Sequence, residues 1–249
     1  MNETLRRIGC VLLLVMAAAP LAAQEKAEKI KVLIVTGFDA GSHPWRATTH
    51  QAVATLEAAG KFTVKVSEDI GIFESSSLEN YDVVVLNYGF WNEPEPSDEA
   101  KKAILNYVKS GKGLVSLHFA CSSFQGWDEY RELLGRVWVR GVGGHGPRGE
   151  FTVKIENSEH PVTAGMSDFK ADDELYAKLS GDAEIEVLAS AYSDWSNKVE
   201  PIVFVKPYGK GRVVHNVLGH DTRARENPAF QKLLVRGVEW AAAGKVTAE

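Results

Sequence analysis

The sequence has little cysteine and no concentration of basic residues, and each shortage excludes a class of protein. Only two of its 249 residues are cysteine, Cys10 and Cys121. Because Cys10 lies in a segment that we expect to be removed, Cys121 has no disulfide partner within the mature chain, and the fold must depend on its buried core. The formal net charge is −5, and Lys and Arg do not cluster, so nucleic acid is not expected as a partner.

The N-terminal region lacks an apolar run of the ~20 residues that a membrane span requires. Its shorter apolar run, residues 8–19, follows Arg6 and Arg7 and leads into small residues before Gln24. This order is typical of a secretory signal peptide. We therefore expect residues 1–23 to be removed. Residues 24–249 should then form a single periplasmic or secreted domain that is not attached to the membrane.

Short apolar runs alternate with helical patterns along the rest of the chain. In the first half we expect strands at residues 30–36, 62–66, 82–87 and 114–118, and helices at 46–59 and 97–110. In the second half we expect strands at 151–156 and 185–189, a hairpin of 201–206 with 212–217, and a helix at 227–242. Strands that are apolar on both faces and separated by helices indicate an α/β fold. Its sheet should be doubly wound and mostly parallel, with helices on both faces and a C-terminal hairpin addition.

Histidines lie at the ends of three of these predicted strands. His43 comes after the first strand, His118 ends the fourth strand, and His220 comes after the last strand. Ligands of an open parallel sheet bind at the carboxyl ends of its strands, so these positions predict a site. Polar and aromatic neighbours suit a small-molecule carbohydrate, and no nucleotide cofactor is expected. The residues that we expect to contact this substrate are Asp39, His43, Trp45, Asn87, Tyr88, Trp91, Ser122 and Tyr176.

The remaining histidines differ in what their surroundings suggest. His145 lies in a glycine-rich loop that can approach a ligand closely, so it is a further candidate. His50 should lie on a helix surface, His160 should have a structural role in a turn before a proline, and His215 should lie buried within a strand.

Six short motifs in a fixed order resemble the ThuA-like (trehalose utilisation) family. They are GLVSLH (113–118), WDEY (127–130), HPV (160–162), DELY (173–176), GKGRV (209–213) and LGHD (218–221). The resemblance extends over about residues 30–242. It implies the flavodoxin-like fold of the class I glutamine amidotransferase-like superfamily and a link to carbohydrate metabolism, including that of oxidised (3-keto) sugars.

The resemblance further implies a comparison with the amidotransferases of that superfamily. Those enzymes have a catalytic cysteine at a tight strand-to-helix turn and a histidine after a late strand. Cys121 lies near the first position, and His220 lies near the second. The glycines that flank such a turn are missing from residues 119–123. We therefore expect Cys121 to be a small buried thiol, and we do not expect a glutamine amidotransferase.

The predicted function is that of an enzyme, a lyase, isomerase or hydrolase, acting on a 3-keto sugar or glycoside. His118 and His220 would transfer protons, with Glu174 or Asp221 assisting, because a ketone acidifies the neighbouring C–H group. A divalent metal such as zinc, held by His118, His145 and His220, would serve as an electrophile. The alternative is a non-catalytic glycan-binding module with the same site. The oligomeric state stays open, a homo-oligomer included.

Overall fold

The computed structural model describes residues 28–37, 41–89 and 95–247. The predicted signal peptide and two of the predicted substrate-binding residues, Asp39 and Trp91, lie outside these ranges. Within them, no helix combines the length and the apolar character that crossing a membrane requires.

Nine strands of the described residues form one sheet, in the order β2-β1-β3-β4-β11-β10-β9-β6-β7. The first five of these strands run parallel: β1 (Ile30–Val35), β2 (Phe62–Ser67), β3 (Val83–Leu86), β4 (Gly113–Leu117) and β11 (Gly211–Asn216). Valine, isoleucine and leucine dominate β1 and β3, and such runs form strands that are buried on both faces. The predicted flavodoxin-like α/β fold is confirmed.

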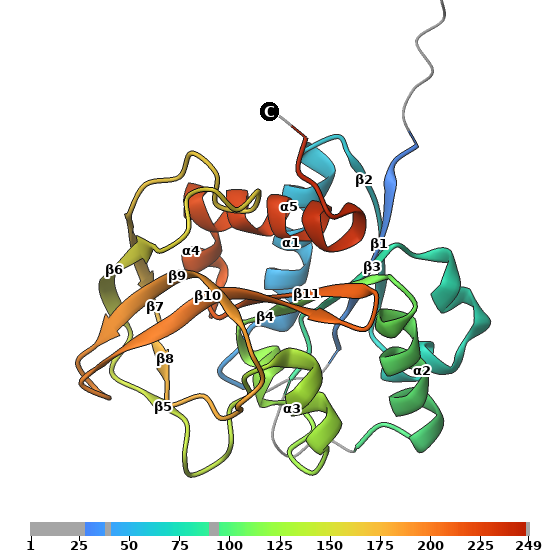
Figure 1. The fold of residues 1–249 in the computed structure, drawn as a ribbon, viewed down its shortest axis with the longest axis horizontal. Coiled ribbons are helices and arrows are strands. Elements are labelled where there is room, and N and C mark those ends of the chain that lie inside the picture. Colours follow the sequence, from blue (N-terminus) through green and yellow to red (C-terminus); the bar gives the residue numbers. More distant parts are fainter. Residues whose placement is uncertain (1–27, 38–40, 90–94, 248–249) are drawn as a thin grey trace, which may run out of the picture.

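Helices cover both faces of the sheet, as predicted. The helices are α1 (Trp45–Ala58), α2 (Asp98–Lys109), α3 (Asp128–Leu134), α4 (Thr222–Arg225) and α5 (Pro228–Ala243), with short 3₁₀ turns η1 (Ile70–Glu74), η2 (Ser76–Asn80) and η3 (His118–Ser122). Figure 1 shows α1 and α5 on one side and α2 and α3 on the other. The described residues form two hydrophobic cores. Leu56 of α1 and Phe230 of α5 belong to one core, and Ile104 of α2 and Leu133 of α3 belong to the other. Burial of these apolar side chains supplies the main stabilisation of each layer.

The helix boundaries follow the capping residues in the sequence. The Ser97 side chain accepts a hydrogen bond from the Ala100 backbone at the start of α2, and Asn227 does the same for Ala229 at the start of α5. Gly244 ends α5 in the left-handed conformation, at φ 70°, which glycine adopts without strain.

Four antiparallel strands extend the sheet beyond β11. They are β10 (Lys198–Tyr208), β9 (Glu186–Ser193), β6 (Gly149–Ile155) and β7 (Phe169–Asp173). The predicted hairpin is present as β10 and β11, and it continues the central sheet because β11 pairs with β4. A small ribbon of β5 (Gly144–His145) and β8 (Tyr176–Ala177) lies beside this extension. The strands β5, β7 and β8 are not predicted, because two are very short and β7 is rich in charge.

Candidate active site

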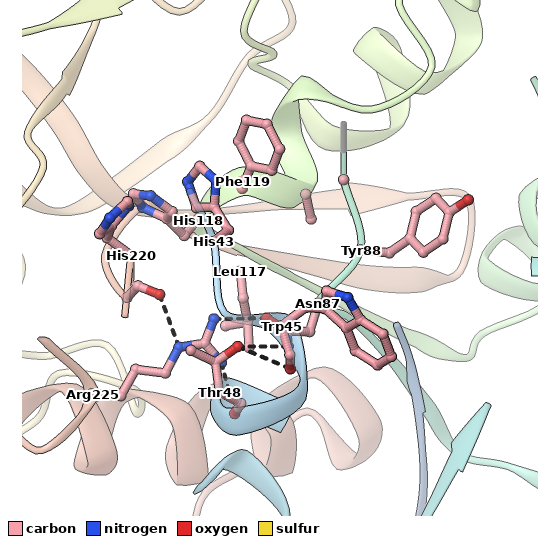
Figure 2. Close-up of a pocket in the computed structure, with 13 residues that line it drawn as sticks. His43, Trp45, Thr48, Asn87, Tyr88, Leu117, His118, Phe119, His220 and Arg225 are labelled. Atoms are coloured by element: carbon pink, nitrogen blue, oxygen red, sulfur yellow. Dashed lines mark hydrogen bonds between the residues drawn. The ribbon is translucent and has the colours of Figure 1, made fainter. Parts of the chain in front are cut away.

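Three histidines and one glutamate converge at the carboxyl edge of the parallel strands. His43 lies between β1 and α1, His118 directly follows β4, and His220 follows β11. Glu174 comes from the antiparallel extension, between β7 and β8. One side-chain nitrogen or oxygen of each lies within 4.8 Å of the corresponding atoms of the other three. We call these four residues the histidine cluster. Figure 2 shows its three imidazole rings side by side.

His118 stands at the turn that ends β4, in an uncommon backbone conformation. Its φ is +43°, in the left-handed region that residues other than glycine rarely adopt. Its Nδ1 lies 2.7 Å from the carbonyl oxygen of Val217. Because a carbonyl only accepts, Nδ1 carries the hydrogen and donates it. Nε2 is buried without a hydrogen-bond partner. This nitrogen is available to a proton or a metal ion.

Glu174 forms the centre of the charge arrangement. Its Oε2 lies 3.0 Å from Nδ1 of His220, 3.7 Å from Nε2 of His145 and 3.8 Å from Nε2 of His118. Burial raises the pKa of the Glu174 carboxyl, but the imidazoles of His118 and His220 outweigh it and hold that pKa well below its usual range. Glu174 is therefore a carboxylate.

His220 responds to that carboxylate in the opposite direction. Burial lowers the pKa of His220, but the negative charge of Glu174, with smaller contributions from Asp221 and Asp173, outweighs burial and raises the pKa above 6.5. His220 and Glu174 thus form a pair in which the carboxylate favours the protonated imidazole. A general acid needs this property.

His43 differs from His220 in its protonation. Burial, together with the nearby imidazoles of His118 and His220, lowers the pKa of His43 to about 2, so the ring is neutral. Its Nε2 lies 3.2 Å from the hydroxyl of Tyr176, and its ring stacks on Phe119 at 3.9 Å between centroids. Burial raises the pKa of the Tyr176 phenol well above 10, so Tyr176 keeps its hydrogen.

The cluster can chemically hold a divalent cation. Three imidazole nitrogens and one carboxylate oxygen are the donors that zinc prefers, and three protein ligands with an open position are typical of a catalytic site. In most metal-binding histidines, the ring nitrogen that does not bind the metal donates a hydrogen bond that fixes the ring. The bond from Nδ1 of His118 to the Val217 carbonyl is of this kind. The predicted ligand set was His118, His145 and His220. The structure places His43 with His118 and His220, and His145 contacts Glu174 from outside the group.

Asp173 is a residue that the sequence did not single out for the site. It is 2% exposed, and its oxygens accept hydrogen bonds from the backbone of Gly219 at 2.6 Å, His220 at 3.1 Å and Glu174 at 2.8 Å. These bonds join the end of β7 to the turn after β11, and so bring Glu174 and His220 together. No spacing in the sequence reveals this link, because it crosses 46 residues.

Arg225 is the second residue that the sequence did not reveal. Its buried guanidinium donates to the carbonyls of Gly219 at 2.9 Å and Thr48 at 3.2 Å, and to the side-chain oxygen of Asn87 at 2.7 Å. Asn87 also donates to Thr49 at 2.9 Å. Asn87, predicted to bind substrate, therefore takes part in a hydrogen-bond network below the histidines (Figure 2).

The other predicted site residues fall into two groups. Tyr176 lies against the cluster, with its ring centroid 4.1 Å from that of His118. Trp45 and Tyr88 line the small cavity beside the cluster and are 7% and 8% exposed. By contrast, Ser122 is buried and donates to the carbonyl of Phe119, while Asp221 caps α4 and pairs with Arg148 at 3.2 Å. The contacts of Asp221 thus indicate a structural role.

Cys121 lies fully buried within η3, where burial raises the pKa of its thiol to about 12. A thiol of this kind carries almost no thiolate at neutral pH and is a poor nucleophile. His118, rather than Cys121, occupies the left-handed position at the end of β4. The other histidines lie as expected: His50 is exposed on α1, His160 packs on Trp240, and His215 is buried in β11 beside Phe204.

The cavity beside the cluster is small, with a volume of about 20 Å³. That space accommodates a water molecule or a metal ion, since a water needs roughly 10–15 Å³. Its lining includes His43, His118 and His220, which Figure 2 shows above Thr48 and Arg225.

Comparison with known proteins places this geometry in a family. The chain resembles the crystal structure of a ThuA-like protein from Parabacteroides merdae, with 30% identity, a TM-score of 0.79, and 89% of this chain and 93% of the other covered. A ThuA-like protein from Bacteroides uniformis has 22% identity and a TM-score of 0.72, with coverage of 92% and 97%. A glutamine amidotransferase from Thermotoga maritima, at 14% identity, a TM-score of 0.55 and coverage of 87% and 99%, shares the fold.

No curated protein matches the chain. The model of the family described as "ThuA: Trehalose utilisation" matches residues 31–241. That match includes all four residues of the histidine cluster. The chain belongs to the ThuA trehalose-utilisation family.

Proposed function

We propose that this protein is an exported enzyme of carbohydrate metabolism that moves a proton on an oxidised (3-keto) sugar or glycoside. The observation that carries the proposal is the position of two histidines beside one carboxylate. Glu174 favours the protonated form of His220, whereas Nδ1 of His118 donates to the Val217 carbonyl and leaves Nε2 for a proton. A general acid and a general base can thus act at the same point of the sheet edge.

The reaction we infer begins at the carbon next to the ketone. Nε2 of His118 takes the proton from C2 of a 3-keto glycoside, and the C–H electron pair moves onto the ketone oxygen as an enolate. The enolate then returns these electrons to form a C1–C2 double bond while the C1–O glycosidic bond breaks. The departing oxygen takes a proton from His220. Isomerisation would use the first step alone and would return the proton to another carbon.

Ordinary glycoside hydrolysis is a weaker proposal for this site. It commonly requires two carboxyl groups roughly 5–10 Å apart across the scissile bond. Glu174 is the one carboxylate of the histidine cluster, and Asp173 is committed to three backbone N–H groups. Histidine, with a reference pKa near ~6.5, suits reversible proton transfer from carbon.

Metal-assisted catalysis, with a divalent ion such as zinc, is a second candidate mechanism for the same cluster. The four ligand atoms within 4.8 Å favour it, and an ion there would polarise the ketone as a Lewis acid. His43, His118, His220 and Glu174 would then be ligands. His145, which lies 3.7 Å from Glu174 but outside the group, would be the nearby histidine that remains free for proton transfer.

Metal analysis distinguishes the metal-assisted form of the proposal from the form without a metal. Protein purified without a histidine tag would be measured by elemental analysis, then assayed with and without chelator. The metal-assisted form predicts bound zinc or a similar ion in the wild type and its loss in a His43→Ala, His118→Ala, His220→Ala triple variant. Full activity of metal-free protein would exclude the metal-assisted form and leave proton transfer by His118 and His220.

The substrate proposal is tested by comparing trehalose and sucrose with their 3-keto forms, following products by mass spectrometry. We expect turnover of the keto forms and a loss of about 10²–10⁴-fold on removing His118 or His220. Turnover of the unoxidised sugars alone would refute the proposal. Binding of sugars without any turnover would instead indicate a glycan-binding module.

A further inference from the structure

A groove opens where two strands of the antiparallel extension separate. β6 pairs with β9 through Lys154↔Ser190 and Ile155↔Ala189, and the two strands then diverge. The space between them has a volume of about 320 Å³, at the lower end of the roughly 300–1,000 Å³ of small-molecule sites. Its lining includes Glu150, Phe151, Leu175, Tyr192, Asp194 and Trp195.

Two aromatic side chains of this groove are unusually exposed. Trp195 is 44% exposed and Tyr192 is 51% exposed, although large aromatic side chains are usually buried on folding. The Trp195 ring also lies so close to Gly144 that a Cβ there would be 2.3 Å from it. The Nζ atom of Lys178 lies over the same ring, 4.4 Å from the ring centroid. Trp195 is therefore both fixed in place and accessible, which suits recognition rather than packing.

The groove and the histidine cluster both adjoin the ribbon of β5 and β8, because Leu175 of the groove and Glu174 of the cluster directly precede β8. His145 of β5 reaches Glu174, and alternation along a strand directs Gly144 and Gly146 to the opposite face, toward Trp195. Leu175, which lines the groove, directly follows Glu174. The groove thus lies on the back of the ribbon whose front bears His145.

The cavity at the cluster is too small to enclose a sugar ring. At about 20 Å³ it holds an ion or a water, so most of a sugar substrate must contact surface outside it. The aromatic groove is about sixteen times as large, as the ratio of about 320 Å³ to about 20 Å³ shows. Gly146, which lines the groove, directly follows His145, and His145 contacts Glu174 of the cluster.

We propose that this groove is a carbohydrate-binding site for a neutral pyranose unit of a longer glycan or glycoside. The reacting sugar of that molecule lies at the histidine cluster, so the inference rests on the proposed function. The C–H faces of a pyranose pack on Trp195 and Tyr192, and its hydroxyls donate to the carboxylates of Glu150 and Asp194. Lys170 pairs with Glu150 at 3.5 Å and the Lys178 ammonium lies over the Trp195 ring, so charges of both signs surround the groove and suit a neutral sugar.

Calorimetric titration of the full mature protein tests the site with defined probes: maltohexaose, cellohexaose and glucose. The variants are Trp195→Ala and Tyr192→Ala, and the second covers the case in which the first does not fold. Val66→Ala is the control, because Val66 is 43% exposed, lies on β2 at the far edge of the sheet and is absent from the groove. Thermal melts establish that each variant is folded.

We expect a hexasaccharide to bind the wild type more tightly than glucose does. Its dissociation constant should rise about tenfold in each aromatic variant, the scale of losing a stacked ring, and stay unchanged in the control. Failure of both hexasaccharides to bind the wild type, or equal binding by wild type and both folded variants, would overturn the proposal.

A kinetic comparison keeps this inference distinct from the proposed function. With 3-keto glycosides of increasing length, Trp195→Ala should raise KM for the longer substrates and leave kcat nearly unchanged. Glycan binding at the groove without turnover of any keto-sugar would support the groove and refute the proposed enzyme. Turnover that depends on His118 but is the same in Trp195→Ala for every length would refute the groove and support the enzyme.

Discussion

At the scale of single residues, Glu174 raises the pKa of His220 against the effect of burial. Replacing Glu174 with Gln removes the charge that raises the pKa of His220, and burial, which lowers that pKa, then acts unopposed. His220 should lose its proton at lower pH, so the alkaline limb of the rate profile should move to lower pH. The rate on a keto-sugar should fall about 10²–10⁴-fold. The measurement is a pH–rate profile, with Glu57→Gln, on the exposed side of α1, as a control.

An unchanged profile for Glu174→Gln would show that this carboxylate does not control the acid. It would also remove the argument for assigning His220, rather than another group, as the proton donor.

Cys121 offers the complementary residue-scale prediction. Its thiol is fully buried, and its pKa of about 12 excludes a thiolate near neutral pH. We expect Cys121→Ala to retain kcat/KM within a few-fold on the keto-sugar substrate, with a small loss of stability from the smaller side chain. Steady-state kinetics and thermal unfolding measure both. A loss of more than about a hundredfold in a folded variant would revive a cysteine nucleophile.

At the scale of elements, the site depends on a junction between β7 and the end of β11. Asp173 makes this junction, accepting from three backbone N–H groups. In Asp173→Asn one acceptor oxygen becomes a donor, which leaves a buried N–H without a partner. We expect a loss of about 1–3 kcal/mol in unfolding free energy and a lower kcat, because Glu174 and His220 separate. Urea unfolding and kinetics provide the two measurements.

The neighbouring Asp172 supplies a matched control. Its carboxylate is partly exposed and pairs with Arg148 and Arg223 at the surface, where ion pairs contribute about 0–1 kcal/mol. Equal effects of Asp173→Asn and Asp172→Asn on kcat would contradict a special role for the buried junction.

These elements also show what the sequence can and cannot reveal. Apolar runs followed by histidine predicted the positions of His43, His118 and His220, because parallel strands end at one edge. The position of Glu174 depends on β7, whose sequence FKADD has no clear strand pattern, and on pairing with distant β6. The grouping of His43, rather than His145, with the others depends on loop geometry that spacing does not encode.

At the scale of the whole molecule, we predict export from the composition of the first 23 residues. The basic start, the short apolar run and the small residues before Gln24 predict cleavage at that point. Protein recovered from the periplasm or medium of an expressing bacterium should begin near Gln24 when its N-terminus is sequenced. Intact Met1 in a membrane fraction would contradict the prediction.

The central claim, proton abstraction beside a ketone, is tested most directly with a 3-keto disaccharide that carries deuterium at C2. The mature protein would be incubated with this substrate in ordinary water, and the products analysed by NMR and mass spectrometry. The account predicts loss of the deuterium from C2 on turnover, by elimination and by isomerisation alike, above the rate of an enzyme-free control. It also predicts a loss of turnover of about 10²–10⁴-fold in His118→Asn, a substitution chosen because asparagine tolerates the left-handed backbone at this position. Products that retain the deuterium at C2, or turnover that His118→Asn leaves unchanged, would contradict the account.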